Sequence, residues 1–306
     1  MAPKKTHILC IASRKGGCGK STTSVNLAAA LAHEYRVCVV DTDPQCNSSI
    51  NLGYDPDALI AEGKKTVADA YLTKTAAKEI ALPYMNNFDG RLTVIASNRG
   101  LGAVPDRLEA DLRSTGARED VSELDIDDIK NEHRLRLKRS LDSLRGEHCD
   151  FVLIDTPPEL RFLTTAAMLA ADALVIPVFC SKYDLDGMQA VTKALRKVQQ
   201  TFNPNLKLLG VLVGNFNARA RLDKDVRKML TKTFAESENG VFDTVISQSV
   251  RIREATAYDQ TIFDHAENEP PANQFLALAR EVVTRLGMQG TGVLAPLVEE
   301  KEVANV

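Results

Sequence analysis

Short apolar runs alternate along the chain with longer segments in which apolar residues recur every three to four positions. The runs are rich in Val, Ile and Leu on consecutive positions, without polar alternation. They are His7 to Ala12, Arg36 to Val40, Leu92 to Ala96, Phe151 to Ile154, Ala173 to Val178, Leu206 to Val213 and Val241 to Ile246. Consecutive apolar positions are typical of strands that are buried on both faces of a parallel sheet.

The segments between these runs have helical periodicity. They predict helices at about Ser21 to His33, Leu160 to Ala171, Asp186 to Phe202, Leu222 to Phe234 and Pro271 to Leu286. Strands that alternate with helices indicate βαβ crossovers. We therefore expect an α/β fold in which a mostly parallel, twisted sheet carries helices on both faces.

The alternation predicts a single domain over residues 1–290, with two departures. Residues 99–146 are polar, with an acidic stretch from Glu119 to Glu132 and a basic one from Arg134 to Arg139. We interpret this region as a charged, solvated insertion that leads into a helix, the alternative being a dedicated partner site. Residues 291–306 are expected to form a flexible tail.

Composition narrows the possible functions. The chain has 306 residues and a net charge of −3, so binding to nucleic acid requires a local basic patch, and a wholly basic, histone-like protein is excluded. The six cysteines form no C-x-x-C pair, which favours buried, reduced thiols over disulfides or a zinc site. No apolar run approaches the roughly 20 residues of a membrane span, and we expect a cytoplasmic protein.

A glycine-rich segment, Arg14 to Thr22, follows the first apolar run and precedes a helix, the context of a phosphate-binding loop. Its glycines let successive N–H groups point into one concavity, to which the helix N-terminus adds positive potential. Lys20 can reach the β and γ phosphates, while the Ser21 hydroxyl can ligate Mg²⁺. The alternative is a tight turn without a ligand. The residues expected at the nucleotide are Gly16, Gly17, Cys18, Gly19, Lys20, Ser21 and Thr22.

The loop also carries a second lysine, Lys15. It departs from the phosphate-loop pattern G-x-x-x-x-G-K-S/T, because Arg14 stands where that pattern has its first glycine. Lys15 to Thr22 instead match K-G-G-x-G-K-S/T-S/T in full and resemble the ParA/MinD family of deviant Walker ATPases. This resemblance implies a P-loop NTPase that uses ATP and Mg²⁺ and forms an ATP-dependent homodimer. It assigns Lys15 the role of reaching the partner's phosphates.

Carboxylates follow two of the apolar runs. The second run ends in Asp41-Thr-Asp43-Pro-Gln, and Phe151 to Ile154 is followed by Asp155-Thr-Pro-Pro. Carboxyl ends of neighbouring parallel strands meet at one edge of a sheet, where open α/β sheets bind ligands. The resemblance implies that Asp43 orients or activates the attacking water and that Asp41 supports the Mg²⁺ shell or the loop. Asp155 has the Walker B position and is expected to hold Mg²⁺ opposite Ser21.

Each acidic position also has a plainer interpretation. Asp43 precedes a proline and could simply begin a turn or cap a helix. The two prolines after Asp155 could merely terminate a strand. Asn215 resembles the residue near which related ATPases hold adenine, and its amide can read a purine edge. A strand-ending asparagine in a turn is the alternative there.

Two basic segments near the end favour the ParA branch of the family. They are Asn217-Ala-Arg-Ala-Arg-Leu and Ser249-Val-Arg-Ile-Arg-Glu-Ala, and the resemblance implies that their arginines bind DNA without sequence preference. Arg219 and Arg251 are the matching positions. A solvated basic face is the alternative. Further residues that could extend the patch are Arg221, Lys224, Arg227, Lys228 and Arg253. Ser247 stands where the family usually carries proline, a departure that affects the local loop geometry but removes no chemistry.

The resemblance thus implies an ATPase that dimerises on ATP, binds DNA on the nucleoid and moves a plasmid or chromosome cargo through a ParB-like partner. Hydrolysis is expected to be slow until the partner and DNA set the switch loops. A MinD-like membrane ATPase is the main alternative, but the acidic end of the chain lacks a basic amphipathic helix, so we expect no membrane partner. An iron–sulfur reductase using Cys149 and Cys180, or a ligase on the same scaffold, is a third possibility.

Overall fold

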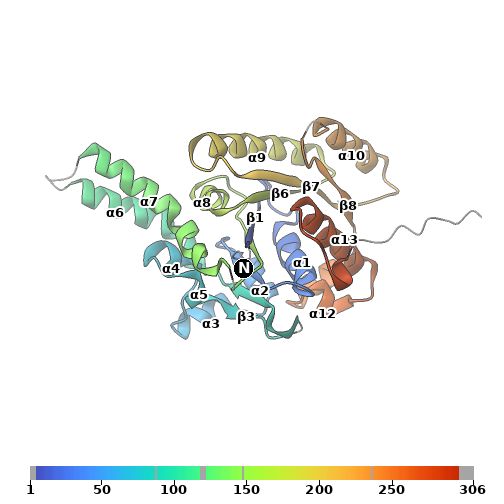
Figure 1. The fold of residues 1–306 in the computed structure, drawn as a ribbon, viewed down its shortest axis with the longest axis horizontal. Coiled ribbons are helices and arrows are strands. Elements are labelled where there is room, and N and C mark those ends of the chain that lie inside the picture. Colours follow the sequence, from blue (N-terminus) through green and yellow to red (C-terminus); the bar gives the residue numbers. More distant parts are fainter. Residues whose placement is uncertain (1–4, 87, 118–121, 147, 236, 296–306) are drawn as a thin grey trace, which may run out of the picture.

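The computed structural model describes residues 5–86, 88–117, 122–146, 148–235 and 237–295. Within these ranges, eight strands form one sheet in the order β3-β4-β2-β5-β1-β6-β7-β8 (Figure 1). The strands are β1 (His7–Ile11), β2 (Val37–Asp41), β3 (Leu82–Pro83), β4 (Leu92–Ile95), β5 (Phe151–Asp155), β6 (Ala173–Phe179), β7 (Lys207–Phe216) and β8 (Val241–Ser247). Only the β3–β4 pair is antiparallel, so the predicted mostly parallel α/β sheet is confirmed.

The helices surround this sheet. Those in the first half are α1 (Lys20–Ala32), α2 (Asn47–Asn51), α3 (Pro56–Ala61), α4 (Val67–Leu72), α5 (Ala77–Ile80), α6 (Val104–Gly116) and α7 (Glu123–Leu141). Those in the second half are α8 (Phe162–Ala170), α9 (Lys182–Thr201), α10 (Arg221–Thr233), α11 (Val250–Ala257), α12 (Ile262–Ala266) and α13 (Pro270–Arg285).

Each strand serves two hydrophobic cores because successive side chains point to opposite faces of the sheet. In β1, Ile8 and Cys10 belong to one core, while Leu9 and Ile11 belong to the other. The first core is covered by α4, α7, α8, α9 and α10, and the second by α1, α12 and α13 (Figure 1). The unbroken apolar runs of the sequence reflect this double burial.

The predicted strands and helices are all present, with ends that move by a few residues. Helix α9 begins at Lys182, ahead of the predicted Asp186. Strand β8 departs from the predicted double burial because it lies at the edge of the sheet, where its Asp243 is exposed. The antiparallel β3 and the short helices between residues 47 and 80 were not predicted, since they lack a periodic stretch of sufficient length.

The polar region at residues 99–146 forms the α6–α7 hairpin, which projects from one side of the domain (Figure 1). The expectation that this region is solvated is wrong at both of its ends. Leu101 and Leu108 at one end, with Leu137 and Leu141 at the other, are buried in the core that α8 covers. Glu119 and Asp120 of the acidic stretch, and residues 296–306 of the tail predicted at 291–306, lie outside the described residues. The described start of the predicted tail contains a 3₁₀-helix, Gly292–Leu294, in which Leu294 is buried. No helix in the described ranges is long and apolar enough to cross a membrane.

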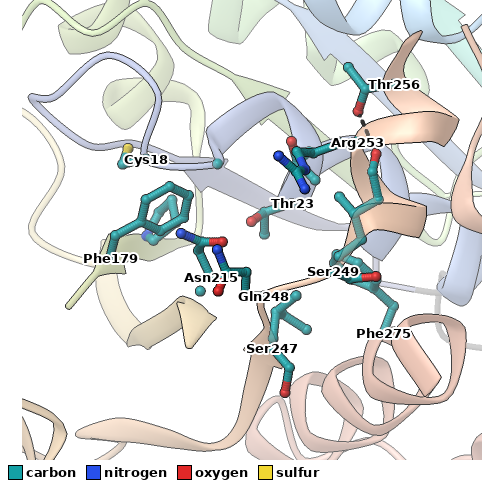
Figure 2. A pocket seen from close by; sticks show the side chains of 16 residues that line it. Cys18, Thr23, Phe179, Asn215, Ser247, Gln248, Ser249, Arg253, Thr256 and Phe275 are labelled. Carbon is teal, nitrogen blue, oxygen red and sulfur yellow. Dashed lines mark hydrogen bonds between the residues drawn. The ribbon is translucent and has the colours of Figure 1, made fainter. Parts of the chain in front are cut away.

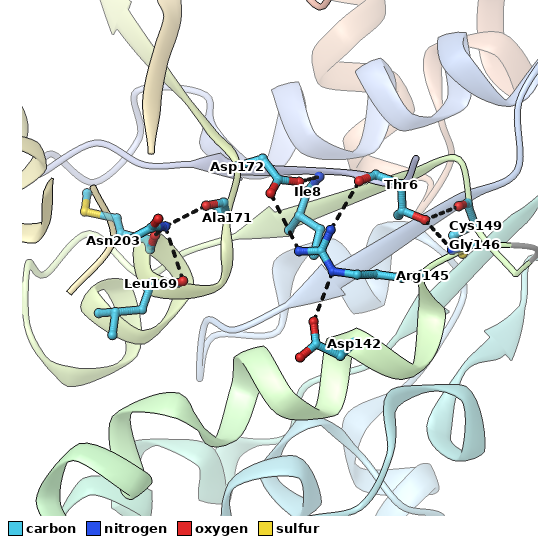
Figure 3. A network of polar contacts seen from close by, with 11 residues as sticks. Thr6, Ile8, Asp142, Arg145, Gly146, Cys149, Leu169, Ala171, Asp172 and Asn203 are labelled. Atoms are coloured by element: carbon cyan, nitrogen blue, oxygen red, sulfur yellow. Dashed lines mark hydrogen bonds and ion pairs between the residues drawn. The ribbon is translucent and has the colours of Figure 1, made fainter. Parts of the chain in front are cut away.

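Polar side chains tie together the end of the sheet where the strands begin (Figure 3). Asp172 accepts a hydrogen bond from the Ile8 amide at 2.9 Å, and Arg145 pairs with Asp172 at 3.6 Å. Next to them, the buried Asn203 amide donates to three carbonyls at the end of α8, those of Met168, Leu169 and Ala171. Because helix ends leave carbonyls unpaired, this one side chain satisfies groups that would otherwise be buried without a partner.

We predict that Asn203→Ala lowers the free energy of unfolding by about 1–3 kcal/mol, because it leaves buried carbonyls of α8 without a donor. Urea denaturation measures the change. Asn131→Ala, on an exposed position of α7, is the matched control and should change stability by less than about 0.5 kcal/mol. Equal stability of the two variants would contradict this role for Asn203.

Candidate functional site

The glycine-rich loop lies between β1 and α1 and has the backbone that a phosphate cradle needs. Gly17 and Gly19 have φ angles of 73° and 84°, a left-handed conformation that side chains rarely allow. A Cβ atom at Gly16 or Gly17 would meet nothing within 4 Å, so the loop faces open space. Gly19 is the N-cap of α1, and the unpaired amides of that helix start beside the loop. The arrangement suits an anion.

The two lysines of the loop have different partners. The Lys20 side chain is only 6% exposed, and its Nζ donates to the Lys15 carbonyl at 3.2 Å. Lys15 reaches in another direction, with its Nζ 3.4 Å from the Ser181 hydroxyl beyond the end of β6. Lys20 therefore turns into the cradle, whereas Lys15 lies along its rim.

Two buried carboxylates stand side by side at the ends of β2 and β5. Asp41 and Asp155 are paired in the ladder, and both are fully buried. Asp155 accepts hydrogen bonds from Ser48 at 2.7 Å and Ser24 at 3.3 Å. Burial raises the pKa of Asp155, an effect that the nearby hydroxyls of Ser21 and Ser48 and the Lys20 ammonium oppose.

Asp41 holds the loop that follows β2. Its carboxylate accepts from the Asp43 amide at 3.0 Å and from the amide and hydroxyl of Ser49 at 2.8 and 2.7 Å. Burial and the charge of Asp155 raise the pKa of Asp41. Of the two roles expected for Asp41, these contacts favour support of the loop.

Asp43 lies on the same edge, 5% exposed, with Oδ1 accepting from the Gln45 amide at 2.9 Å. The turn that was the plainer interpretation of Asp43 is thus present. The residue also lines a cavity of about 520 Å³ between the loops after β2 and β5, shared with Pro157 and Pro158. A carboxylate beside a cavity can serve a turn and a reactant at once, so both interpretations of Asp43 are compatible with this geometry.

The oxygen atoms of Ser21 and Asp155 fit a magnesium ion. Mg²⁺ prefers hard oxygen ligands and is commonly bound by one or two carboxylates together with substrate phosphates. Among the described residues there is no group of three or more His, Cys, Asp or Glu side chains placed to hold a metal. Ser21 and Asp155 therefore fit a magnesium site in which phosphate oxygens at the loop supply further ligands.

A second cavity, of about 460 Å³, continues from the loop toward β7 and β8 (Figure 2). Cys18, Gly19 and Thr22 line its phosphate side. The Phe179 ring fills the space between Gly19 and Gly214, each of which would place a Cβ 3.2 Å from it. Its size and its mixture of apolar and amide groups suit a nucleoside whose phosphates enter the loop.

Asn215 lines this second cavity, as expected of a residue near the base. Gln248, Phe179 and Arg253 line it too and were not predicted there. Arg253 was expected to extend a DNA-binding patch, but its position in the cavity wall differs from that expectation. Phe179 directly follows the fifth apolar run, Ala173 to Val178, and this aromatic residue was a signal that sequence analysis could have used. Ser247, the departure from proline, is fixed by Gln274, which bonds both its amide and its hydroxyl at 2.9 Å.

The basic residues that were predicted to bind DNA, other than Arg253, lie after β7 and β8. Arg219 and Arg221 are exposed just before and at the start of α10. Arg251 pairs with Glu254 at 3.0 Å and Glu269 at 3.8 Å, so acidic neighbours balance its charge. A groove of about 610 Å³ along α10 is lined by the basic residues Lys224, Arg227, Lys228 and Lys232. All four basic residues of this groove belong to α10.

The cysteines are all free thiols, as predicted, and most are buried. Cys149 precedes β5 and Cys180 follows β6, so they lie at opposite ends of two strands of one parallel sheet. This separation places them too far apart to bind one cluster together within a chain.

Comparisons with known proteins agree with this geometry. A family model described as an AAA domain matches residues 6–208. The chromosome partitioning protein ParA of Myxococcus xanthus is 31% identical over 281 residues, which cover 91% of this chain and 88% of that protein.

Solved structures share the fold. An ATP complex of a Cyanothece McdA variant superposes with a TM-score of 0.75 at 19% identity, covering 94% of this chain and 99% of that one. The septum site-determining protein MinD of Pyrococcus horikoshii, complexed with Mg-ADP, has a TM-score of 0.66 at 22% identity, covering 92% and 98%.

We predict that Phe179→Leu weakens binding of a fluorescent ATP analogue about 2–10-fold, because the lost ring contact is worth about 0.5–1.5 kcal/mol. Fluorescence titration measures the affinity. Phe202→Leu, at an exposed phenylalanine beyond the end of α9, is the control and should leave the affinity unchanged. If Phe179→Leu binds as tightly as the control, the nucleoside does not use this cavity.

Proposed function

Because the chain belongs to the ParA/MinD family of P-loop ATPases, we propose that it is a ParA-type ATPase that binds ATP with Mg²⁺, dimerises and moves a DNA cargo. The observation that carries the proposal is the convergence of three features at one edge of the sheet. The glycine cradle with Lys20 follows the carboxyl end of β1. The buried Asp155, beside Ser21, lies at the carboxyl end of β5, and Asp43 lies at its cavity just after β2. Phosphoryl transfer needs this combination of positioning and charge neutralisation.

The residues divide the work of hydrolysis between them. The loop amides and the Lys20 ammonium bind the phosphates, while Ser21 and Asp155 hold Mg²⁺, which neutralises charge on the phosphate oxygens. Asp43 orients the attacking water, and Asp41 keeps the Asp43 amide in place. The nucleoside occupies the cavity beside Asn215. Hydrolysis is slow because Asp43 is held in a turn until a partner and DNA reset the loop.

Dimerisation supplies a further cation. Lys15 lies at the rim of the cradle, beside Ser181, and not inside it with Lys20. From the rim it contacts the phosphates bound to a second copy of the chain and neutralises charge there. ATP binding in this arrangement favours the dimer, because each nucleotide then has contacts with both protomers.

The dimer binds DNA without sequence preference through phosphate contacts. Arg219, Arg221 and Arg251 follow the carboxyl ends of the neighbouring strands β7 and β8, so they share the edge that carries the nucleotide. The basic groove on α10 extends this surface. The protein acts in the cytoplasm on the nucleoid, with a ParB-like centromere-binding protein that stimulates hydrolysis and release.

We predict that Asp43→Ala binds ATP with normal affinity but hydrolyses it at least 10-fold more slowly, because the water loses its orienting carboxylate. Phosphate release and fluorescent-nucleotide titration measure the two quantities. Asp89→Ala, at an exposed residue of the loop before β4, should hydrolyse ATP at the normal rate. Wild-type turnover in Asp43→Ala would contradict the assignment, and absence of Mg²⁺-dependent hydrolysis in the natural sequence would contradict the proposed function.

We predict that Lys224→Glu combined with Lys228→Glu lowers the affinity for a random-sequence duplex at least 10-fold in the ATP state. The variant should also show a weaker dependence on salt, since fewer phosphates are neutralised. Fluorescence anisotropy at two salt concentrations measures both. Arg107→Glu with Arg113→Glu, on the exposed face of α6, makes the same change of charge and should bind DNA normally. Equal loss in both double variants would show an effect of net charge alone.

A further inference from the structure

The two buried carboxylates are bound by two consecutive serines of one short helix. In α2, Ser48 Oγ donates to Asp155 Oδ2 at 2.7 Å, and Ser49 Oγ donates to Asp41 Oδ2 at 2.7 Å. All four side chains are fully buried. A single turn of helix thus contacts the end of β5 with one side chain and the end of β2 with the next.

Ser48 is the donor that fixes the orientation of Asp155. A serine hydroxyl has one hydrogen to donate. The Ser24 hydroxyl divides it between the Lys20 carbonyl at 3.0 Å and Asp155 Oδ1 at 3.3 Å. Ser48 has the shorter contact, and Asp155 Oδ2 is the acceptor found for it among the described residues. With Oδ2 held by α2, Oδ1 is the oxygen that faces α1.

Ser49 joins the same turn to the loop that carries Asp43. Its amide and hydroxyl both bond Asp41, whose other oxygen accepts from the Asp43 amide. The Ser49 hydroxyl in turn accepts from the Ser97 amide at 2.8 Å, which anchors it to the end of β4. Because Ser48 and Ser49 are adjacent, a movement of the Asp155 carboxylate would therefore also shift the loop that carries Asp43.

We propose that Ser48 is a positioning residue for the metal-binding carboxylate of Asp155, and that α2 couples metal occupancy to the loop of Asp43. This inference rests on the proposed role of Asp155 in binding Mg²⁺. Ser48 touches neither nucleotide nor metal and acts by holding one oxygen so that the other is presented toward Ser21 and α1. Partners of this kind commonly change metal affinity by about 10–100-fold when they are removed.

The test measures metal binding directly. Mn²⁺ is titrated into the full chain saturated with ADP, and free Mn²⁺ is followed by electron paramagnetic resonance. We expect Ser48→Ala to bind Mn²⁺ about 10-fold more weakly, while ADP affinity measured in EDTA stays unchanged. Ser48→Thr keeps the hydroxyl and should restore Mn²⁺ affinity. An Mn²⁺ affinity of Ser48→Ala within about twofold of the natural sequence would overturn the proposal.

Ser140→Ala is the matched control, because its buried hydroxyl bonds a carbonyl, that of Thr75, at the same 2.7 Å but far along α7. It should bind Mn²⁺ normally, and an equal weakening in Ser140→Ala would show a general loss of stability and overturn the positioning role.

Hydrogen exchange tests the coupling. Metal binding should slow exchange at residues 43–49 in the natural sequence and not in Ser48→Ala, and equal slowing in both would overturn the coupling.

The two proposals fail in different ways. If the natural sequence binds nucleotide and Mn²⁺ but does not hydrolyse ATP, the proposed function fails while the comparison of Mn²⁺ affinities still decides the role of Ser48. If it hydrolyses ATP with Mg²⁺ and Ser48→Ala binds Mn²⁺ normally, only the role of Ser48 fails.

Discussion

The site depends on the burial of two carboxylates next to each other, Asp41 and Asp155, at the ends of two paired strands. Two negative charges in a dry environment repel each other, and each must also replace the hydrogen bonds that water would supply. The chain meets both demands with hydroxyl and amide groups from α1, α2 and the loop after β2. The same groups that satisfy the carboxylates therefore determine where the loops lie, so the shape of the site follows from an electrostatic requirement of the fold.

Much of the fold was predictable because double burial leaves a clear signal in the sequence. Apart from His7 and Asp155 at their ends, strands β1 and β5 are apolar on every position, and the helices between the strands are long enough to show their period. β8 was placed correctly but given the wrong environment, since its apolar content does not reveal that it lies at the edge. The α6–α7 hairpin was misjudged for a related reason. Its charged middle dominates the composition, whereas a few leucines at its ends determine how it packs.

The residues of the site fall into the same two groups, those with a local signal in the sequence and those without one. Lys20, Ser21, Asp43 and Asp155 were predicted from sequence because each follows a strand end or a local pattern with its own chemistry. Ser48 and Phe179 were not predicted, and Arg253 was expected at DNA and not in the cavity wall, because their surroundings come from segments far away in the chain. Ser48 becomes important only when α2 folds against β5, and Phe179 only when β6 lies next to the glycine loop. Local spacing carries no information on contacts of this kind.

The hydrogen-bonded network at the start of the strands, where Arg145, Asp172 and Asn203 meet, lies at the end opposite to the nucleotide loops. Strands of five residues separate the two ends by about 16 Å. This distance makes the far end a suitable place for a fluorescent probe or a surface tether. Lys207, exposed at the first position of β7, offers an attachment point there, whereas the partly exposed thiol of Cys180 lies next to the loops. A dye at Lys207 would therefore allow single molecules to be followed on DNA with the loops left unmodified.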